Sequence, residues 1–185
     1  MKKLLAFIML FACTVGIQAK SDLQLIKGSL AELKGSQATV SVEWDYSHST
    51  IEHKSIKEFL KEKGPDWEAD YADEIKRAEE NFISRMNDKS KDVKTIGDPD
   101  GDYKIVVKVR DFDYGNTTAS VLVGFGVGDA RLYGTLEIYK NGSAKPIAEL
   151  DMDGVSGAGF GNEKRRVEAY RELAETLSKL IKKAK

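Results

Sequence analysis

The chain has 185 residues, of which 29 are Lys or Arg and 30 are Asp or Glu, so its formal net charge is -1. This length favours one domain with a core large enough to be stable without disulfides. The 32% of charged and 9% of aromatic residues are typical of a globular protein and argue against a disordered or fibrous one. The near-neutral charge gives no general attraction to nucleic acid, which is not expected as a partner.

The first 19 residues have the order of charge, apolar run and small residue that marks a secretory signal peptide. Two lysines precede an apolar run from Leu4 to Ile17, and Ala19 supplies the small residue of a cleavage site. The run is short for a membrane span, and polar sequence follows it. We therefore expect export to the periplasm or cell surface, removal of residues 1–19, and a single domain over residues 20–185.

Cys13 is the chain's single cysteine, which excludes an intrachain disulfide and a cysteine-based zinc site. It also permits a second interpretation, in which Leu10-Phe11-Ala12-Cys13 is a lipoprotein box and acylated Cys13 becomes the new terminus. Phe11 is unusual in such a box, and the apolar run continues beyond the cysteine, so cleavage after Ala19 is preferred. Membrane association is expected only under the lipoprotein alternative.

Two strands are expected first along the mature chain. An apolar run covers residues 23–26, and residues 37–46 alternate between an apolar and a polar face. Gly28 and Gly35 lie between these two runs. The glycines and the short separation indicate a hairpin.

Two helices are predicted next. Residues 55–62 form a short helix that ends at Gly64-Pro65. From residue 66 to about residue 88, apolar residues lie three or four positions apart, which is the pattern of one buried helical stripe. The stripe comprises Trp67, Tyr71, Ile75, Ala78, Phe82 and Met86. We assign it to core packing.

Three strands follow. Residues 103–109 alternate, and the alternation inverts after Val109, which predicts a β-bulge or a strand end near Arg110. The alternating runs 132–139 and 146–152 flank Asn141-Gly142, the strongest short-range signal for a hairpin.

A second long amphipathic helix is predicted over residues 162–183, with Asn162 as its cap and lysines in its last turn. Its many charged residues, Arg165 and Arg166 included, mix both signs and are expected on a salt-bridged solvent face. The order of elements predicts an α+β fold: a mostly antiparallel sheet of about five strands, with two long amphipathic helices packed on one face.

Two glycine-rich segments are candidates for binding. Gly124–Gly128 leads into a strand and lacks the features of a phosphate loop, and the loop Gly154–Gly161 lacks an anion-binding signature before its helix. Residues 119–127 are apolar without clean alternation, which favours a buried or edge strand or, if exposed, a partner surface. The expected partner-binding residues are Val121, Leu122, Phe125, Val127 and Phe160.

Asp98, Asp100 and Asp102 have the spacing that opens a calcium loop. Tyr103 replaces the glycine needed at the sixth position, and Val109 replaces the bidentate glutamate needed at the twelfth. A polar turn is therefore preferred, and a metal site on the three aspartates is the alternative. No cofactor is expected.

Catalytic patterns are weak in this sequence. His48 and His53 are its two histidines, and we expect both in a solvated loop rather than in a zinc site. The sequence has no G-x-S-x-G and no H-E-x-x-H motif. An acid and base pair for hydrolysis is still available in two candidate sets of aspartates, Asp111 with Asp113 and Asp151 with Asp153.

Three short motifs resemble those of a family of uncharacterised secreted proteins of Gram-negative bacteria. They are Leu33-Lys34-Gly35, a strand that ends in Asp45-Tyr46-Ser47, and Arg166-Val167-Glu168-Ala169-Tyr170 in the last helix. The order of elements is also similar to that of the amino-terminal domain of TolB and the periplasmic domain of CsgG. The resemblance implies a binding or assembly module of the envelope, and it implies no catalytic residues.

We therefore predict an exported, non-enzymatic binding or assembly module of the cell envelope. Its expected partner is an envelope protein or a surface component, and its oligomeric state is left open. The alternative is an exported hydrolase that uses paired aspartates.

Overall fold

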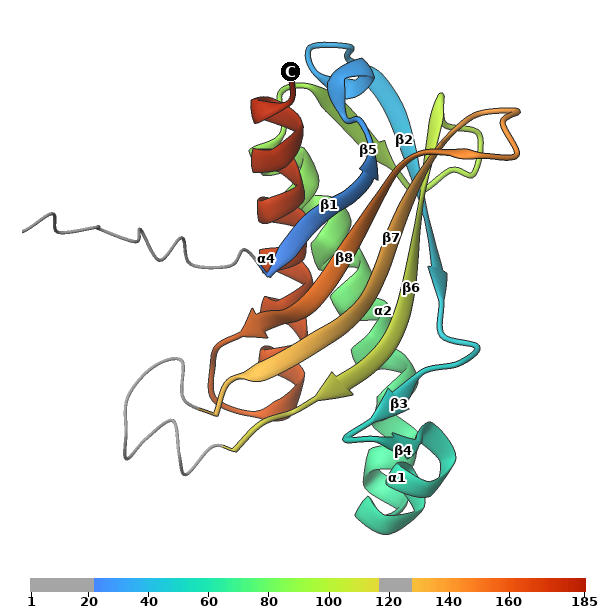
Figure 1. Cartoon of the computed structure of the whole chain (residues 1–185). Helices are drawn as coiled ribbons and strands as arrows, with labels where there is room; N and C mark the ends of the chain where they lie inside the picture. Colours follow the sequence, from blue (N-terminus) through green and yellow to red (C-terminus); the bar gives the residue numbers. More distant parts are fainter. Residues whose placement is uncertain (1–21, 117–127) are drawn as a thin grey trace, which may run out of the picture.

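The computed structural model describes residues 22–116 and 128–185. Its elements follow in chain order: β1 (Leu23–Gly28), a 3-10 turn (Ala31–Leu33), β2 (Ala38–Asp45), β3 (Thr50–Ile51), β4 (Lys54–Ser55), α1 (Ile56–Lys63), α2 (Pro65–Lys89), β5 (Val93–Ile96), β6 (Tyr103–Asp113), β7 (Ala130–Lys140), β8 (Pro146–Gly157) and α4 (Asn162–Lys183). Figure 1 shows the long strands crossing in front of α2 and α4.

Within the described residues, eight strands form one mixed sheet in the order β1-β8-β7-β6-β2-β5, with β3 paired to β6 and to β4. Neighbours from β1 to β6 are antiparallel, whereas β2 is parallel to both β6 and β5. The prediction of about five strands is therefore wrong. The missed strands β3, β4 and β5 have two to four residues each, too few to show a period in the sequence.

The prediction that two long helices pack side by side on one face of the sheet is also wrong. Helix α4 packs on β8, β7 and β1, whereas α2 packs mainly on α4, on α1 and on the edge strand β5. The described helices therefore divide their contacts between the sheet and one another.

The predicted hairpin between the first two strands is wrong. β1 pairs with β8 at one edge of the sheet, where Leu23 lies opposite Met152, and β2 is inserted between β6 and β5. Parallel strands need a long crossover connection, and α1 with α2 supplies it between β2 and β5. Two glycines near one another in sequence carry no information about such a long-range pairing.

Several local predictions are confirmed. All three predicted helices occur with ends within about three residues of the expected ones, and α1 begins with a capping box formed by Ser55 and Glu58. Helix α4 begins at Asn162, so its cap is Gly161 instead. The hairpin at Asn141-Gly142 joins β7 to β8.

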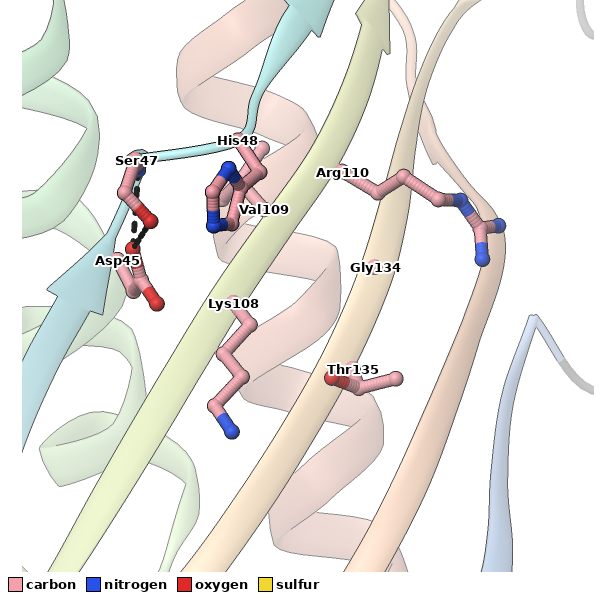
Figure 2. A pocket seen from close by; sticks show the side chains of 8 residues that line it. All are labelled: Asp45, Ser47, His48, Lys108, Val109, Arg110, Gly134 and Thr135. Carbon is pink, nitrogen blue, oxygen red and sulfur yellow. Dashed lines mark hydrogen bonds between the residues drawn. The ribbon is translucent and has the colours of Figure 1, made fainter.

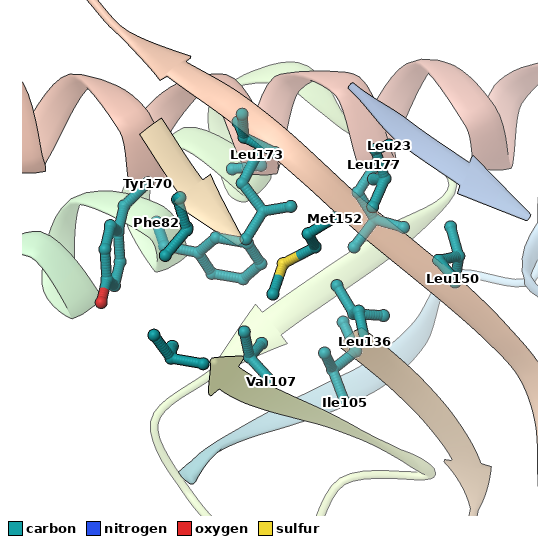
Figure 3. Packing of buried hydrophobic residues seen from close by; sticks show 14 of the residues in the cluster. Leu23, Phe82, Ile105, Val107, Leu136, Leu150, Met152, Tyr170, Leu173 and Leu177 are labelled. Atoms are coloured by element: carbon teal, nitrogen blue, oxygen red, sulfur yellow. The ribbon is translucent and has the colours of Figure 1, made fainter. Parts of the chain in front are cut away.

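The core lies between the sheet and the helices α2 and α4. Figure 3 shows side chains of β6, β7 and β8 meeting those of both helices, among them Val107, Leu136, Met152, Phe82 and Leu173. Each of these five is fully buried. Burial of such apolar area is the main term that stabilises the fold.

A hydrogen-bonded aromatic cluster closes one side of this core. Trp44 stacks on Tyr170 with ring centroids 4.9 Å apart and on Tyr46 at 6.4 Å. The Tyr46 hydroxyl donates to Glu79 Oε1 at 2.8 Å and lies 3.1 Å from the Tyr170 hydroxyl. Burial of Glu79 raises the pKa of its carboxyl group.

Glu79→Gln is expected to raise the free energy of unfolding at neutral pH. Because the folded pKa of Glu79 lies above its unfolded value of 4.5, the folded state binds the proton more tightly, and stability falls as pH rises through that window. Glutamine keeps an oxygen for Tyr46 without the partly buried charge. Urea unfolding across this window measures the effect, with Glu68→Gln, at an exposed position of the same helix, as the matched control. An equal pH slope in wild type and Glu79→Gln would contradict the prediction.

Candidate functional site

A β-bulge and a glycine shape a hollow on the face of the sheet turned away from the core. The register between β6 and β7 slips between Val109 and Asp111, which leaves Arg110 as the extra residue and confirms the predicted bulge. Gly134, paired with Val109, has φ +159°, and a Cβ there would lie 2.1 Å from the carbonyl oxygen of Lys108. The strands approach closely because position 134 has no side chain.

The connection between β2 and β3 forms one wall of the hollow. β2 pairs with β6 as far as Asp45 opposite Lys108, and β3 resumes the pairing at Thr50 opposite Asp111. The Ser47 hydroxyl and backbone N–H donate to Asp45 Oδ1 at 2.6 and 2.9 Å. These two hydrogen bonds lower the pKa of Asp45, so the turn is fixed by an ionised carboxylate.

The hollow has a volume of about 200 Å³. Figure 2 shows Arg110 extending from β6 across β7, His48 on the opposite side, and Lys108 pointing away along the sheet. The lining residues are Asp45, Ser47, His48, Lys108, Val109, Arg110, Gly134 and Thr135. A concave, mostly apolar surface bordered by a few polar side chains is a common form of a small-ligand site.

Of the two cationic side chains at the hollow, one forms an ion pair and the other does not. Lys108 Nζ lies 2.8 Å from Glu137 Oε1, an ion pair between β6 and β7. Within the described part of the chain, by contrast, the side chain of Arg110 makes no hydrogen bond or ion pair. An exposed guanidinium beside a hollow is a ready partner for an anionic group.

The neighbouring aspartate, Asp111, is buried beneath a tight turn. The Thr50 hydroxyl donates to Asp111 Oδ1 at 2.5 Å, and His53 Nδ1 lies 3.0 Å from Oδ2. The turn residues Glu52 and His53 have φ of 51° and 64°, which is unusual for residues other than glycine, and the contacts of Asp111 hold them there.

The paired aspartates of the hydrolase alternative have other partners. Asp111 faces Thr50 and His53, as described above, while Asp113 Oδ1 accepts from the Gly115 N–H at 2.7 Å. Asp151 and Asp153 lie on β8 in register with Thr135 and Tyr133 of β7. The hydrogen bonds of Asp111 and Asp113 thus go to groups other than each other, and the hydrolase alternative stays a prediction.

The three aspartates of the candidate calcium loop lie between β5 and β6. Asp98 Oδ1 accepts from the Asp100 N–H at 3.0 Å, and Asp102 Oδ2 accepts from the N–H and hydroxyl of Thr39 at 2.8 and 2.7 Å. The bonds from Thr39 lower the pKa of Asp102. Among residues 22–116 and 128–185, no group of three or more His, Cys, Asp or Glu side chains is arranged to hold a metal.

Most of the predicted apolar contact surface lies outside the described residues, namely Val121, Leu122, Phe125 and Val127. Phe160 is described, and 66% of it is exposed in the connection between β8 and α4. The glycine loop predicted before α4 is shorter than expected because Gly154 and Gly157 belong to β8. A Cβ at Gly157 would lie 2.1 Å from the Arg165 carbonyl oxygen, so this glycine lets the strand pack against α4.

Sequence reasoning missed a buried ionic cluster. Arg165 and Arg166, predicted on a solvent face, are each only 1% exposed, so that prediction is wrong. Arg166 Nε lies 2.5 Å from Glu74 Oε1, which also accepts from the Tyr114 hydroxyl at 2.7 Å. The available signal was position: Arg166 lies one helical turn before Tyr170, within the buried stripe of α4.

Comparisons with known proteins do not assign the chain to a family. No model of a known protein family matches it, and no curated protein matches it. It is similar to a solved structure titled PelC dodecamer from Paraburkholderia phytofirmans, with 12% identity, a TM-score of 0.44, and coverage of 85% of this chain and 95% of that one. A single-residue variant of that PelC gives 13% identity, a TM-score of 0.42, and coverage of 87% and 97%.

These similarities are too distant to carry a fold assignment or a partner to this chain. The resemblances to secreted proteins, to TolB and to CsgG stay predictions. No helix in the described ranges is long and apolar enough to cross a membrane.

Proposed function

We propose that the chain is an exported, non-enzymatic binding module of the cell envelope, and that the hollow beside the β6 bulge is its ligand site. The observation that supports this most directly is the Arg110 guanidinium, which borders the hollow and makes no ion pair within the described residues. The binding of an oppositely charged group is the simplest use of such a side chain.

Export rests on the leader, with its two lysines, its apolar run and Ala19. A mature chain without cysteine would depend on core packing alone for its stability in an oxidising compartment. The apolar residues Val121, Leu122, Phe125 and Val127, with the exposed Phe160, supply a second contact surface in this proposal. That surface suits a protein partner, whereas the hollow, by its volume, suits a small ligand.

We expect the full chain, produced in a Gram-negative host, to mature to a form that begins at Lys20 and sediments with the cell envelope. Mass spectrometry of the intact mature protein identifies the terminus, and an acylated Cys13 would support the lipoprotein alternative.

Thr135→Trp, which fills the hollow without changing its charge, is expected to release the protein from isolated envelopes. Fractionation followed by immunoblotting measures the release.

Ala144→Trp is the matched control, because Ala144 is exposed in the turn between β7 and β8 and does not line the hollow. This variant should sediment like the wild type. An uncleaved chain that keeps Met1 in the cytosol would contradict the export. Unchanged sedimentation of a folded, exported Thr135→Trp variant would contradict the assignment of the hollow.

A further inference from the structure

We propose that two copies of the chain associate through β1 as a two-fold symmetric dimer, in which the two β1 strands pair antiparallel. β1 is the strand at one end of the sheet, where it lies beside β8 (Figure 1) and pairs with no other described strand. This surface is distinct from the hollow, because no residue of β1 lines the hollow.

Exposed apolar side chains gather on β1. Three large hydrophobic residues are exposed within residues 22–116 and 128–185, and two of them, Leu25 at 42% and Ile26 at 59%, are adjacent on this strand. The strand at the other end of the sheet, β5, has none. An exposed apolar strand at a sheet edge is a template for pairing with another chain. The apolar area of β1 therefore favours a strand as the occupant of this edge.

The backbone of β1 also directs hydrogen-bonding groups away from β8. The N–H of Asp153 donates to the carbonyl oxygen of Asp22 at 2.9 Å, so these two residues form a hydrogen-bonded pair of the antiparallel ladder. Such pairs alternate with pairs whose N–H and C=O groups point to the opposite side of the strand. Leu25 lies three residues after Asp22, in register with Leu150, so its N–H and C=O point outward, where a second strand can bond them.

A β-bulge in β1 places two opposite charges on the same face of the strand. The register between β1 and β8 slips between Leu25 and Lys27, which makes Ile26 the extra residue. In a regular strand, positions 22 and 27 would face opposite sides of the sheet, because side chains alternate. The extra residue brings Asp22 and Lys27 to the same face. Lys27 Nζ lies there 2.7 Å from Glu149 Oε1, and its side chain is still 73% exposed.

The strand is complementary to itself when two copies run antiparallel. With the two-fold axis at Gln24, Asp22 of each copy lies opposite Lys27 of the other, which gives two ion pairs across the interface. On the opposite face, Leu25 of each copy lies opposite Leu23 of the other. A shift of the register by two residues in either direction loses both ion pairs. The charges thus specify one register.

The size of this contact indicates a weak dimer. β1 has six residues, and a pairing of that length buries less than the roughly 1,200–2,000 Å² typical of stable complexes. Burial of Leu25 and Ile26 is the main favourable term, whereas exposed ion pairs contribute little affinity and mainly fix the register. We therefore expect a dimer that dissociates in the micromolar range.

The first test is sedimentation velocity of the purified mature chain at concentrations from about 1 to about 500 µM, which bracket that range. A monomer–dimer equilibrium is expected. Ile26→Lys is expected to raise the dimer Kd by about tenfold or more, because it removes apolar area and adds like charges at the interface. Phe160→Lys, at the third exposed hydrophobic residue, is the matched control and should leave the Kd within about twofold. Thermal melts show whether the variants are folded.

Charge reversal tests the register. Asp22→Lys and Lys27→Asp, each alone, put like charges opposite one another in the dimer and are expected to raise the Kd by about tenfold at low ionic strength. An equimolar mixture of the two variants restores both ion pairs and should dimerise with a Kd within about threefold of the wild-type value. Lys94→Asp, at an exposed position of β5, is the matched control for the change of charge and should leave the Kd unchanged.

A monomer at every concentration would overturn the proposal, as would a dimer whose Kd is unchanged in folded Ile26→Lys. Species larger than a dimer would overturn the two-fold symmetry, because a head-to-tail contact does not close on two copies. A mixture of the charge variants that dimerises no better than either variant alone would overturn the register. None of these outcomes changes the assignment of the hollow, which Thr135→Trp tests.

Discussion

Replacing Arg166 with methionine is expected to lower the free energy of unfolding by about 3–5 kcal/mol, because one partner of a buried ion pair is lost while the other remains. Arg166 is 1% exposed, and its Nε lies 2.5 Å from Glu74 Oε1. Its guanidinium also stacks 4.2 Å from the centre of the Phe112 ring. Methionine fills much of the same volume, so the loss measures the stranded Glu74 carboxylate more than a cavity.

The double variant Glu74→Gln/Arg166→Met is expected to recover a large part of this loss. Without the carboxylate no buried charge is left unpaired, and glutamine keeps an oxygen that accepts from the Tyr114 hydroxyl. Urea denaturation of wild type, both single variants and the double variant gives the coupling energy between the two side chains. If the double variant is as unstable as Arg166→Met, packing on Phe112 and Tyr114 accounts for the effect instead of charge.

The predictions agree with the structure where the interactions are local in sequence, and they differ from it where the interactions are long-range. The stripe in α2 and the Asn141-Gly142 turn are set by residues within a few positions of one another, so the sequence was enough to locate them. The insertion of β2 between β6 and β5 depends on pairing across about 60 residues, for which an alternating pattern gives no partner. Short strands such as β5 have no period of their own.

The candidate site, too, could be predicted only in the part that neighbouring residues determine. The inverted alternation after Val109 predicts the bulge at Arg110, because each residue of a strand must face one side of the sheet. The hollow also needs Gly134 across the strand pair and the turn after Asp45, and neither is adjacent to Arg110 in sequence. Arg166 was assigned to solvent because it is charged, although its spacing from Tyr170 places it in the buried stripe.

Gly134→Ala is expected to lower the free energy of unfolding by about 3 kcal/mol, the upper range for overpacking a core. A Cβ at this position would lie 2.1 Å from the Lys108 carbonyl oxygen and 2.6 Å from Met152 Cε. The methionine can change rotamer, but the carbonyl belongs to the backbone of β6 and moves only if the strand moves. The backbone of Gly134, with φ +159°, adds strain for any residue that has a Cβ.

Gly142→Ala separates the effect of the close contact from the effect of backbone strain. Gly142 also has a positive φ, +78°, but no atom would lie within 4 Å of a Cβ there, so only backbone strain of about 1–2 kcal/mol is expected. Chemical denaturation of both variants measures the difference. Equal losses of stability in the two variants would show that β6 moves at little cost in free energy. The close approach of β6 and β7 would then not fix the shape of the hollow.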